Sequence, residues 1–106
     1  MSVLLAALVA GLFGTVTRAP TMPVCIAGQP CSKPAAGVTL TFVHDGVTAR
    51  SVVTGANGTY RVLLAPGVYT VRVSGLARMQ RMTPVTVTVR RGVVARQAFV
   101  IDTGIR

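Results

Sequence analysis

The feature that most constrains the fold is a run of alternating apolar and polar residues, broken at short intervals by turn signals. In TGANGTYRVLLAPGVYTV, residues 54–71, apolar side chains fall on every second position of two short segments. The letters NG at 57–58 precede the first segment and APG at 65–67 separates the two, and these residue types supply the backbone angles of tight turns. Alternation with a period of two is typical of a strand with one buried face. This stretch therefore predicts a β-hairpin.

The same alternation continues along most of the chain. The positions that it predicts to face inward are Val38, Leu40, Phe42, Tyr60, Val62, Leu64, Tyr69, Val71, Val73, Val85, Val87, Val89, Phe99 and Ile101. An Asp-Gly pair at 45–46 marks a further hairpin. Short strands at a spacing of about ten residues, with no helical pattern after residue 20, predict an all-β fold, an antiparallel sandwich of six or seven strands.

The first nineteen residues differ from the rest, because about fourteen apolar or small residues follow one another from Val3 to Val16. This run is shorter than the ~20 residues of a membrane span, but it suits the apolar region of a secretory signal peptide. We therefore predict a signal helix over residues 1–19, removed there or kept as a short uncleaved anchor, with no transmembrane span after processing. Export to the extracellular space or the cell envelope follows from it. A buried helix of a cytosolic protein is the alternative.

Cys25 and Cys31 enclose five residues, and in an exported protein this spacing predicts one structural disulfide. The loop lies in an N-terminal segment, residues 20–36, ahead of the sandwich at 37–106. A redox pair is the first alternative, but such pairs favour Cys-x-x-Cys. A metal site is the second, and it would need further ligands, for which the chain offers one histidine and two aspartates. No metal or cofactor is expected.

Positive charge is in large excess, because eleven Lys and Arg face two acidic residues and give a net charge of +9. Such an excess favours polyanions or anionic surfaces as partners. Arginines occupy outward positions of the predicted strands at Arg50, Arg61, Arg72, Arg90 and Arg96. Two Arg and two Met also fall in a loop at 75–84, where Met can form an adaptable contact surface. The candidate binding surface comprises Arg61, Arg72, Arg78, Met79, Arg81, Met82 and Arg90. Solvated surface charge is the alternative interpretation.

Groups able to perform catalysis are few and separated in the sequence. General acid–base chemistry needs two titratable groups that converge on a pocket, whereas His44 and Asp45 flank a hairpin turn and Asp102 lies near the C-terminal end. A triad of Ser51 with His44 and Asp45 would require neighbours in one hairpin to reach triad geometry. We therefore expect no enzymatic activity.

Two stretches, PAAGVTLTF at 34–42 and TGANGTYRVLLAPGVYTVRVSG at 54–75, resemble the carboxypeptidase regulatory-like domain. The resemblance covers Ala36 to Val89, and the ending resembles small exported bacterial proteins that carry this domain. It implies a seven-stranded, transthyretin-like Greek-key sandwich and a non-catalytic role, as in the accessory domains of metallocarboxypeptidases. Hydroxyisourate hydrolases share this fold but use several histidines and a Tyr-Arg-Gly-Ser ending, which this chain lacks.

These features together predict a non-catalytic, exported interaction module of the cell envelope. Its expected partner is an anionic wall polymer, a phospholipid surface or another protein. A carbohydrate-binding module and a transthyretin-like carrier of a small ligand are the alternatives. The predicted strands show no outward aromatic residue for a sugar, and export together with the inward tyrosines argues against nucleic acid.

Overall fold

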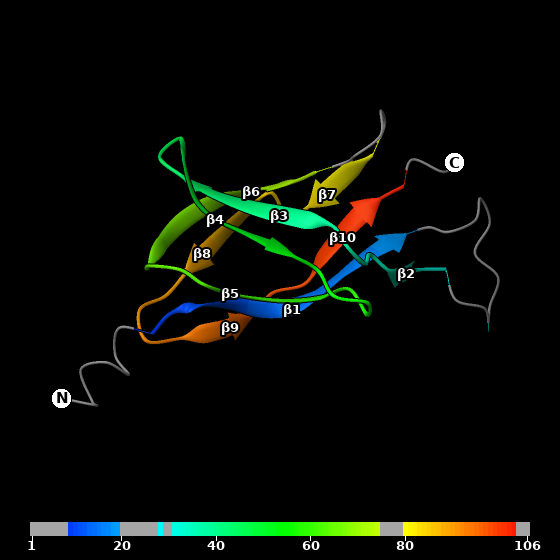
Figure 1. The fold of residues 1–106 in the computed structure, drawn as a ribbon, viewed down its shortest axis with the longest axis horizontal. Coiled ribbons are helices and arrows are strands. Elements are labelled where there is room, and N and C mark those ends of the chain that lie inside the picture. Colours follow the sequence, from blue (N-terminus) through cyan, green and yellow to red (C-terminus); the bar gives the residue numbers. More distant parts are fainter. Residues whose placement is uncertain (1–8, 20–27, 29–30, 75–79, 104–106) are drawn as a thin grey trace.

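The computed structural model describes residues 9–19, 28, 31–74 and 80–103, and within these residues it shows two β-sheets and no helix (Figure 1). The strands are β1 (Gly11–Ala19), β2 (Lys33–Pro34), β3 (Thr39–His44), β4 (Val47–Val53), β5 (Thr59–Leu63), β6 (Gly67–Val73), β7 (Arg81–Thr83), β8 (Thr86–Val89), β9 (Val94–Arg96) and β10 (Phe99–Asp102). No helix of the length and apolar character needed to span a membrane occurs among the described residues. The all-β prediction is confirmed, but the predicted number of six or seven strands is too low, because the described residues form ten.

The smaller sheet has the order β4-β3-β6-β8 and is antiparallel throughout. Asp45 and Gly46 connect β3 to β4, and both have positive φ angles, 50° and 78°, as a two-residue type I′ turn requires. The predicted hairpin at this point is confirmed. The register of the β3–β4 pair shifts between Phe42 and Val43, where the strand carries an irregularity.

The hairpin predicted over residues 54–71 is wrong, although both of its strands exist. β5 pairs with β1 in the larger sheet, whereas β6 pairs with β3 and β8 in the smaller one. The turn at 65–67 therefore carries the chain from one sheet to the other. Alternation identifies the buried face of each strand correctly, but it holds no information about which strand lies alongside.

β1 is the central strand of the larger sheet, so the helix expected over residues 1–19 is wrong for its described part, Gly11–Ala19. The first half of β1 lies between β5 and β9, and the second half lies between β2 and β10. The pairs with β9 and β10 are parallel, so the sheet is mixed rather than purely antiparallel. A continuous apolar run fits a buried strand as well as a helix. Removal of residues 1–19 would take this strand out of the sheet.

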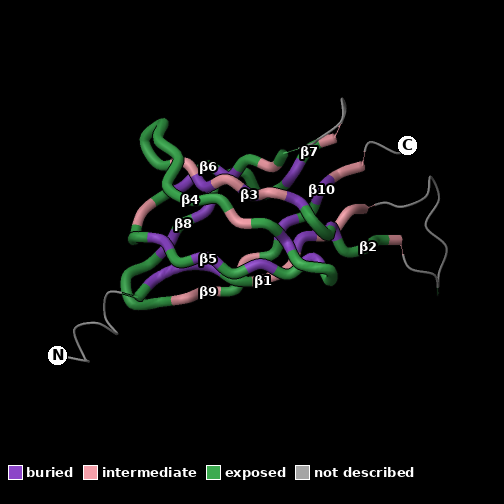
Figure 2. Tube along the Cα trace, viewed as in Figure 1, coloured by how far each residue is buried: buried purple, intermediate pink, exposed green. Residues whose placement is uncertain are grey.

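The core lies between the sheets (Figure 2). Its largest fully buried side chains are Leu12, Val16, Leu40, Phe42, Phe99 and Ile101. Phe42, Tyr60 and Phe99 form an aromatic cluster with ring centroids 5.6–6.5 Å apart. The predicted inward residues are buried except Val73, which is half-buried, and Val85, which is 56% exposed. Val85 precedes β8 at the point where the chain leaves the larger sheet.

Thr54 is the buried polar residue among those described, and its hydroxyl ties the segment before β3 to the end of β4. Its Oγ1 accepts a hydrogen bond from the Val38 amide at 2.9 Å and donates one to the Ala35 carbonyl at 2.5 Å. Both partners belong to buried residues. A polar group that is buried and fully bonded in this way stabilises one chain path over its alternatives.

Candidate binding surface

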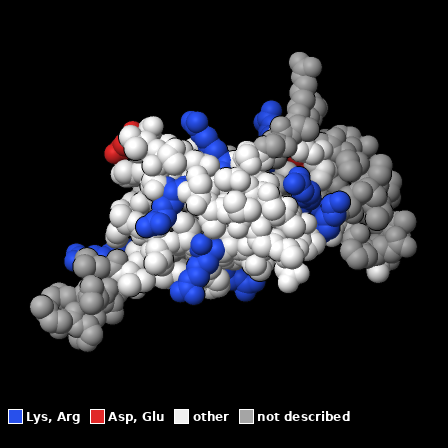
Figure 3. All heavy atoms as spheres, viewed as in Figure 1, with Lys and Arg blue, Asp and Glu red and all other residues white. Residues whose placement is uncertain are grey.

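The arginines of the predicted binding surface do not share one face. Arg61 lies on β5 and Arg81 on β7 in the larger sheet, whereas Arg72 lies on β6 and Arg90 directly follows β8 in the smaller sheet. All four are exposed. Figure 3 shows Lys and Arg side chains scattered along the visible face rather than gathered at one place. A single basic face built from these four residues is therefore not present.

In the loop at 75–84, the prediction that Met82 belongs to the binding surface is wrong. Met82 is only 4% exposed, because β7 alternates and places this side chain in the core, opposite Ile101 of β10. It is not a surface contact. Arg78 and Met79 lie outside the described residues. Cys25 also lies outside them, so its disulfide with Cys31 stays a prediction; Cys31 itself is not a free thiol.

The structure instead brings together an aromatic ring and two arginines on the outer face of β5, β1 and β9. Phe13 of β1 lies opposite Arg61 of β5 on one side and opposite Arg96 of β9 on the other. Side chains in such directly opposed positions share a face and lie about 5 Å apart at their Cβ atoms. Phe13 is 41% exposed, and both arginines are exposed. We call Phe13, Arg61 and Arg96 the Phe13 row.

The alternation of β1 explains why Phe13 faces outward. Leu12 and Val16 point into the core, so Phe13 between them points away from it. A hollow of about 420 Å³ lies beside the ring, with Thr59, Arg61 and Val94 among its lining residues. The Phe13 row thus combines an exposed ring, a depression beside it and two cationic groups.

Hydrogen bonds connect the Phe13 backbone, through Gln97, to the buried residue Tyr60. The Gln97 amide donates a hydrogen bond to the Phe13 carbonyl at 2.8 Å, and the Tyr60 hydroxyl donates one to the Gln97 carbonyl at 2.5 Å. Burial raises the pKa of Tyr60 above its usual range, so its hydroxyl stays protonated and able to donate. A Cβ atom at Gly14 would collide with the Gln97 carbonyl oxygen, so this approach requires glycine. The Phe13 backbone is therefore bonded to Gln97 and, through Gln97, to the core residue Tyr60.

No local acid neutralises the row within the described part of the chain. The ion pair found there joins His44 to Asp45, and neither Arg61 nor Arg96 takes part in it. The nitrogens of both guanidinium groups remain available to an external anion.

A family model of the carboxypeptidase regulatory-like domain matches residues 11–101. The chain belongs to the carboxypeptidase regulatory-like family. The match starts at the first residue of β1 and ends in β10, so the family domain includes the strand that carries Phe13. Domains of this family are generally non-catalytic. A comparison with curated proteins finds no match.

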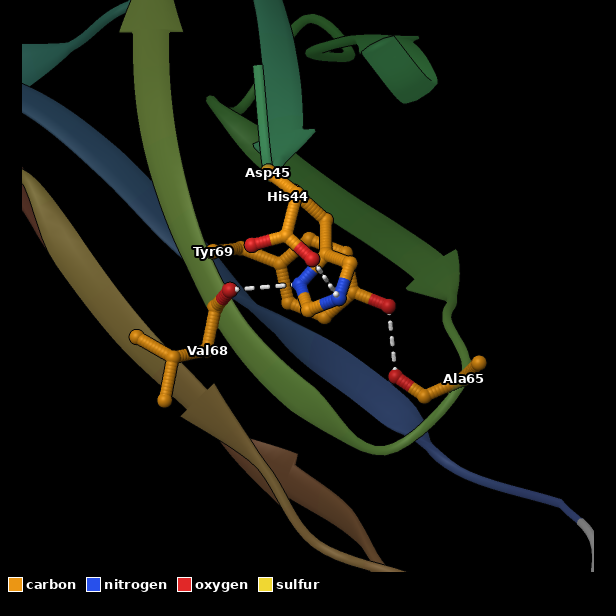
Figure 4. A network of polar contacts seen from close by, with 5 residues as sticks. All are labelled: His44, Asp45, Ala65, Val68 and Tyr69. Carbon is orange, nitrogen blue, oxygen red and sulfur yellow. Dashed lines mark hydrogen bonds and ion pairs between the residues drawn. The ribbon is translucent and has the colours of Figure 1, made fainter. Parts of the chain in front are cut away.

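Figure 4 shows the polar contacts at the β3–β4 turn of this carboxypeptidase regulatory-like domain. His44 Nδ1 donates to the Val68 carbonyl at 2.9 Å, and its Nε2 lies 3.3 Å from Asp45 Oδ2. The His44 ring packs on Tyr69, whose hydroxyl donates to the Ala65 carbonyl at 2.6 Å. The contacts fasten the hairpin tip to β6.

Ser51, the third member of the triad considered from the sequence, does not join this group. Its Oγ lies 3.2 Å from the Thr41 hydroxyl, on the outward side of the smaller sheet. Among the described residues, no group of three His, Cys, Asp or Glu side chains could hold a metal ion. His44, Asp45 and Ser51 therefore do not come together as a triad.

Phe13 is the residue that sequence reasoning missed, because the whole segment to residue 19 was assigned to a signal helix. A signal was present in GLFGTVTRA, residues 11–19, where Phe13, Thr15 and Thr17 alternate with Leu12 and Val16. Arg61 and Arg96 were both recognised as outward arginines. Their placement on either side of one ring depends on register, which the sequence does not reveal.

Proposed function

We propose that this protein is a non-catalytic binding module for an acidic polysaccharide and that the Phe13 row is its binding surface. One observation carries the proposal. Of the five Phe and Tyr residues in the chain, Phe13 is the exposed one, and it lies between two arginines that have no acidic partner among the described residues.

The row offers complementary groups to a charged sugar. The C–H face of a sugar ring is weakly positive and packs on the negative face of an aromatic ring. Carboxylate, sulfate or phosphate groups on that sugar or its neighbours pair with guanidinium groups, which bind planar anions in a bidentate manner. A ring between two guanidinium groups therefore suits a polymer that carries both a sugar ring and an anionic group in each unit.

A nucleic acid fits this surface less well. Modules that bind single strands stack successive bases on several aromatic side chains along a basic groove. Here the other four rings, those of Phe42, Tyr60, Tyr69 and Phe99, are buried. The net charge of +9 would add affinity for any polyanion, and this component is removed by salt.

A location outside the cytoplasm is part of the proposal, since acidic polysaccharides are surface polymers. Two features support it: the apolar residues that precede β1, and Cys31, which is not a free thiol. Disulfides persist in oxidising compartments. A mass measurement of the secreted protein would identify its first residue, which we expect to lie before Gly11, because β1 belongs to the sheet.

The test compares three polymers at 150 mM salt: alginate, with a carboxylate on each sugar ring; polyglutamate, with carboxylates alone; and dextran, with sugar rings alone. We expect alginate to bind most tightly. Phe13→Ala and Arg61→Gln should each weaken it by about tenfold, or 1.4 kcal/mol. Arg72→Gln makes the same change in charge on the other sheet and is the matched control.

Two results would overturn the proposal. The first is equal binding of alginate and polyglutamate, unchanged in Phe13→Ala, which would reduce the interaction to net charge. The second is tighter binding of a single-stranded oligonucleotide than of alginate at the same salt concentration.

A further inference from the structure

A second hollow lies on the open side of the sandwich, between the edge strands β4 and β5. Its volume is about 560 Å³, within the range of small-ligand sites. It shares no lining residue with the hollow beside Phe13.

The hollow exists because the two sheets are not joined along this side. In the described structure β4 pairs with β3 alone and β5 with β1 alone, so both strands present an unpaired edge. The chain crosses between the sheets after β5, and Leu64 and Ala65 line the hollow as it crosses. Val9 and Leu63, both exposed apolar residues, complete much of the wall.

Polar groups are scarce in this wall. The Tyr69 hydroxyl already donates to the Ala65 carbonyl, so neither atom needs a ligand. Arg50 is the charged residue of the lining, and it forms no ion pair with any residue that the structure describes. By register it lies opposite Phe42, whose side chain is in the core, so Arg50 is on the core-facing side of β4 and the outward position predicted for it is wrong. A cation is thus placed at the rim of an apolar hollow.

The geometry points to a binding site for an amphipathic anion, an acyl chain that ends in a single carboxylate. The chain would contact Val9, Leu63 and Leu64, and removal of this apolar surface from water would drive binding. The carboxylate would pair with Arg50 at the rim, where it remains partly solvated. Charge complementarity selects this ligand class over neutral lipids, because a carboxylate forms charge-assisted hydrogen bonds with the guanidinium group, whereas an alcohol of equal length offers only an uncharged acceptor.

The test uses the full chain and calorimetric titration with decanoate and, separately, decanol, both below their aggregation limits. Decanoate should bind at least tenfold more tightly than decanol. Arg50→Gln should remove that difference, while Arg72→Gln, with the same change in charge on the outward side of β6, should retain it. Ala49→Leu adds bulk to the lining without changing the charge, and it should weaken both ligands.

Arg50 and Ala49 are exposed, so these variants should fold, which their melting temperatures would verify. Equal affinity for decanoate and decanol would overturn the proposal. So would equal losses in Arg50→Gln and Arg72→Gln, which would mean that only net charge matters. Unchanged decanoate binding in both Arg50→Gln and Ala49→Leu would also overturn it, and Arg50 would then serve to protect the edge of β4 from pairing with other chains.

Discussion

Replacement of Leu12 by alanine tests whether β1 is a structural part of the domain. Leu12 is 2% exposed and packs in the core from the centre of the larger sheet. Truncation of a fully buried leucine to alanine costs about 2–5 kcal/mol, from lost transfer free energy and the cavity that remains. The free energy of unfolding of a small domain is about 5–15 kcal/mol. Leu12→Ala should therefore remove a large share of the stability of the domain.

The assay is urea denaturation followed by far-UV circular dichroism. The free energy of unfolding falls by about 1–3 kcal/mol for each molar increase in urea, so a loss of about 3 kcal/mol of stability lowers the urea concentration at the midpoint by about 1–3 M. Phe13→Ala is the matched control, because Phe13 is the next residue and faces the opposite side of the strand. Its ring is 41% exposed, so its removal should cost much less, about 1 kcal/mol.

A midpoint that is unchanged in Leu12→Ala would refute this reasoning. It would mean that residues 11–19 are dispensable for folding, as expected of a removable signal segment. Equal losses in Leu12→Ala and Phe13→Ala would also contradict the assignment of the two faces of β1.

Three further predictions concern single groups. Tyr60→Phe should cost about 1 kcal/mol of stability through loss of the hydrogen bond to Gln97. Because burial raises the pKa of Tyr60, the stability that its protonated hydroxyl contributes is present below pH ~10 and is lost as the pH rises beyond that. Urea titrations at alkaline pH should show a smaller loss of stability in the variant. Thr54→Val should cost about 1–3 kcal/mol, since it leaves two buried backbone groups unpaired, and Thr54→Ser should restore most of it; equal midpoints for Val and Ser would contradict this. A thiol-labelling mass spectrum of the unreduced, denatured protein should show neither Cys25 nor Cys31 labelled; labelling of both would exclude the disulfide.

Local signals predicted part of this fold correctly. The Asp-Gly pair at 45–46 placed the β3–β4 hairpin, because two residues with positive φ leave the chain little choice of path. The alternation also identified Phe42, Tyr60 and Phe99 as core residues. Pairing was not predictable in the same way, since the short turn at 65–67 serves a crossing between sheets as well as it serves a hairpin.

The candidate site was only half accessible from the sequence. Exposed arginines can be recognised from alternation, and Arg61 and Arg96 were. Their common neighbour was not, because an apolar run at the start of a chain fits both a signal segment and a central strand. The parallel pairing of β1 with β9 joins residues more than eighty positions apart, and no local pattern encodes that contact.

The most direct test of the Phe13 row is a titration of the isotope-labelled protein with a short oligogalacturonate at 150 mM salt, followed by amide NMR shifts. Shifts should be concentrated at residues 11–15, 59–63 and 94–96, the three strand segments around Phe13, and should largely disappear in Phe13→Ala. Shifts centred on β3 and β6 of the other sheet, or spread evenly over all exposed arginines, would contradict the assignment of this surface.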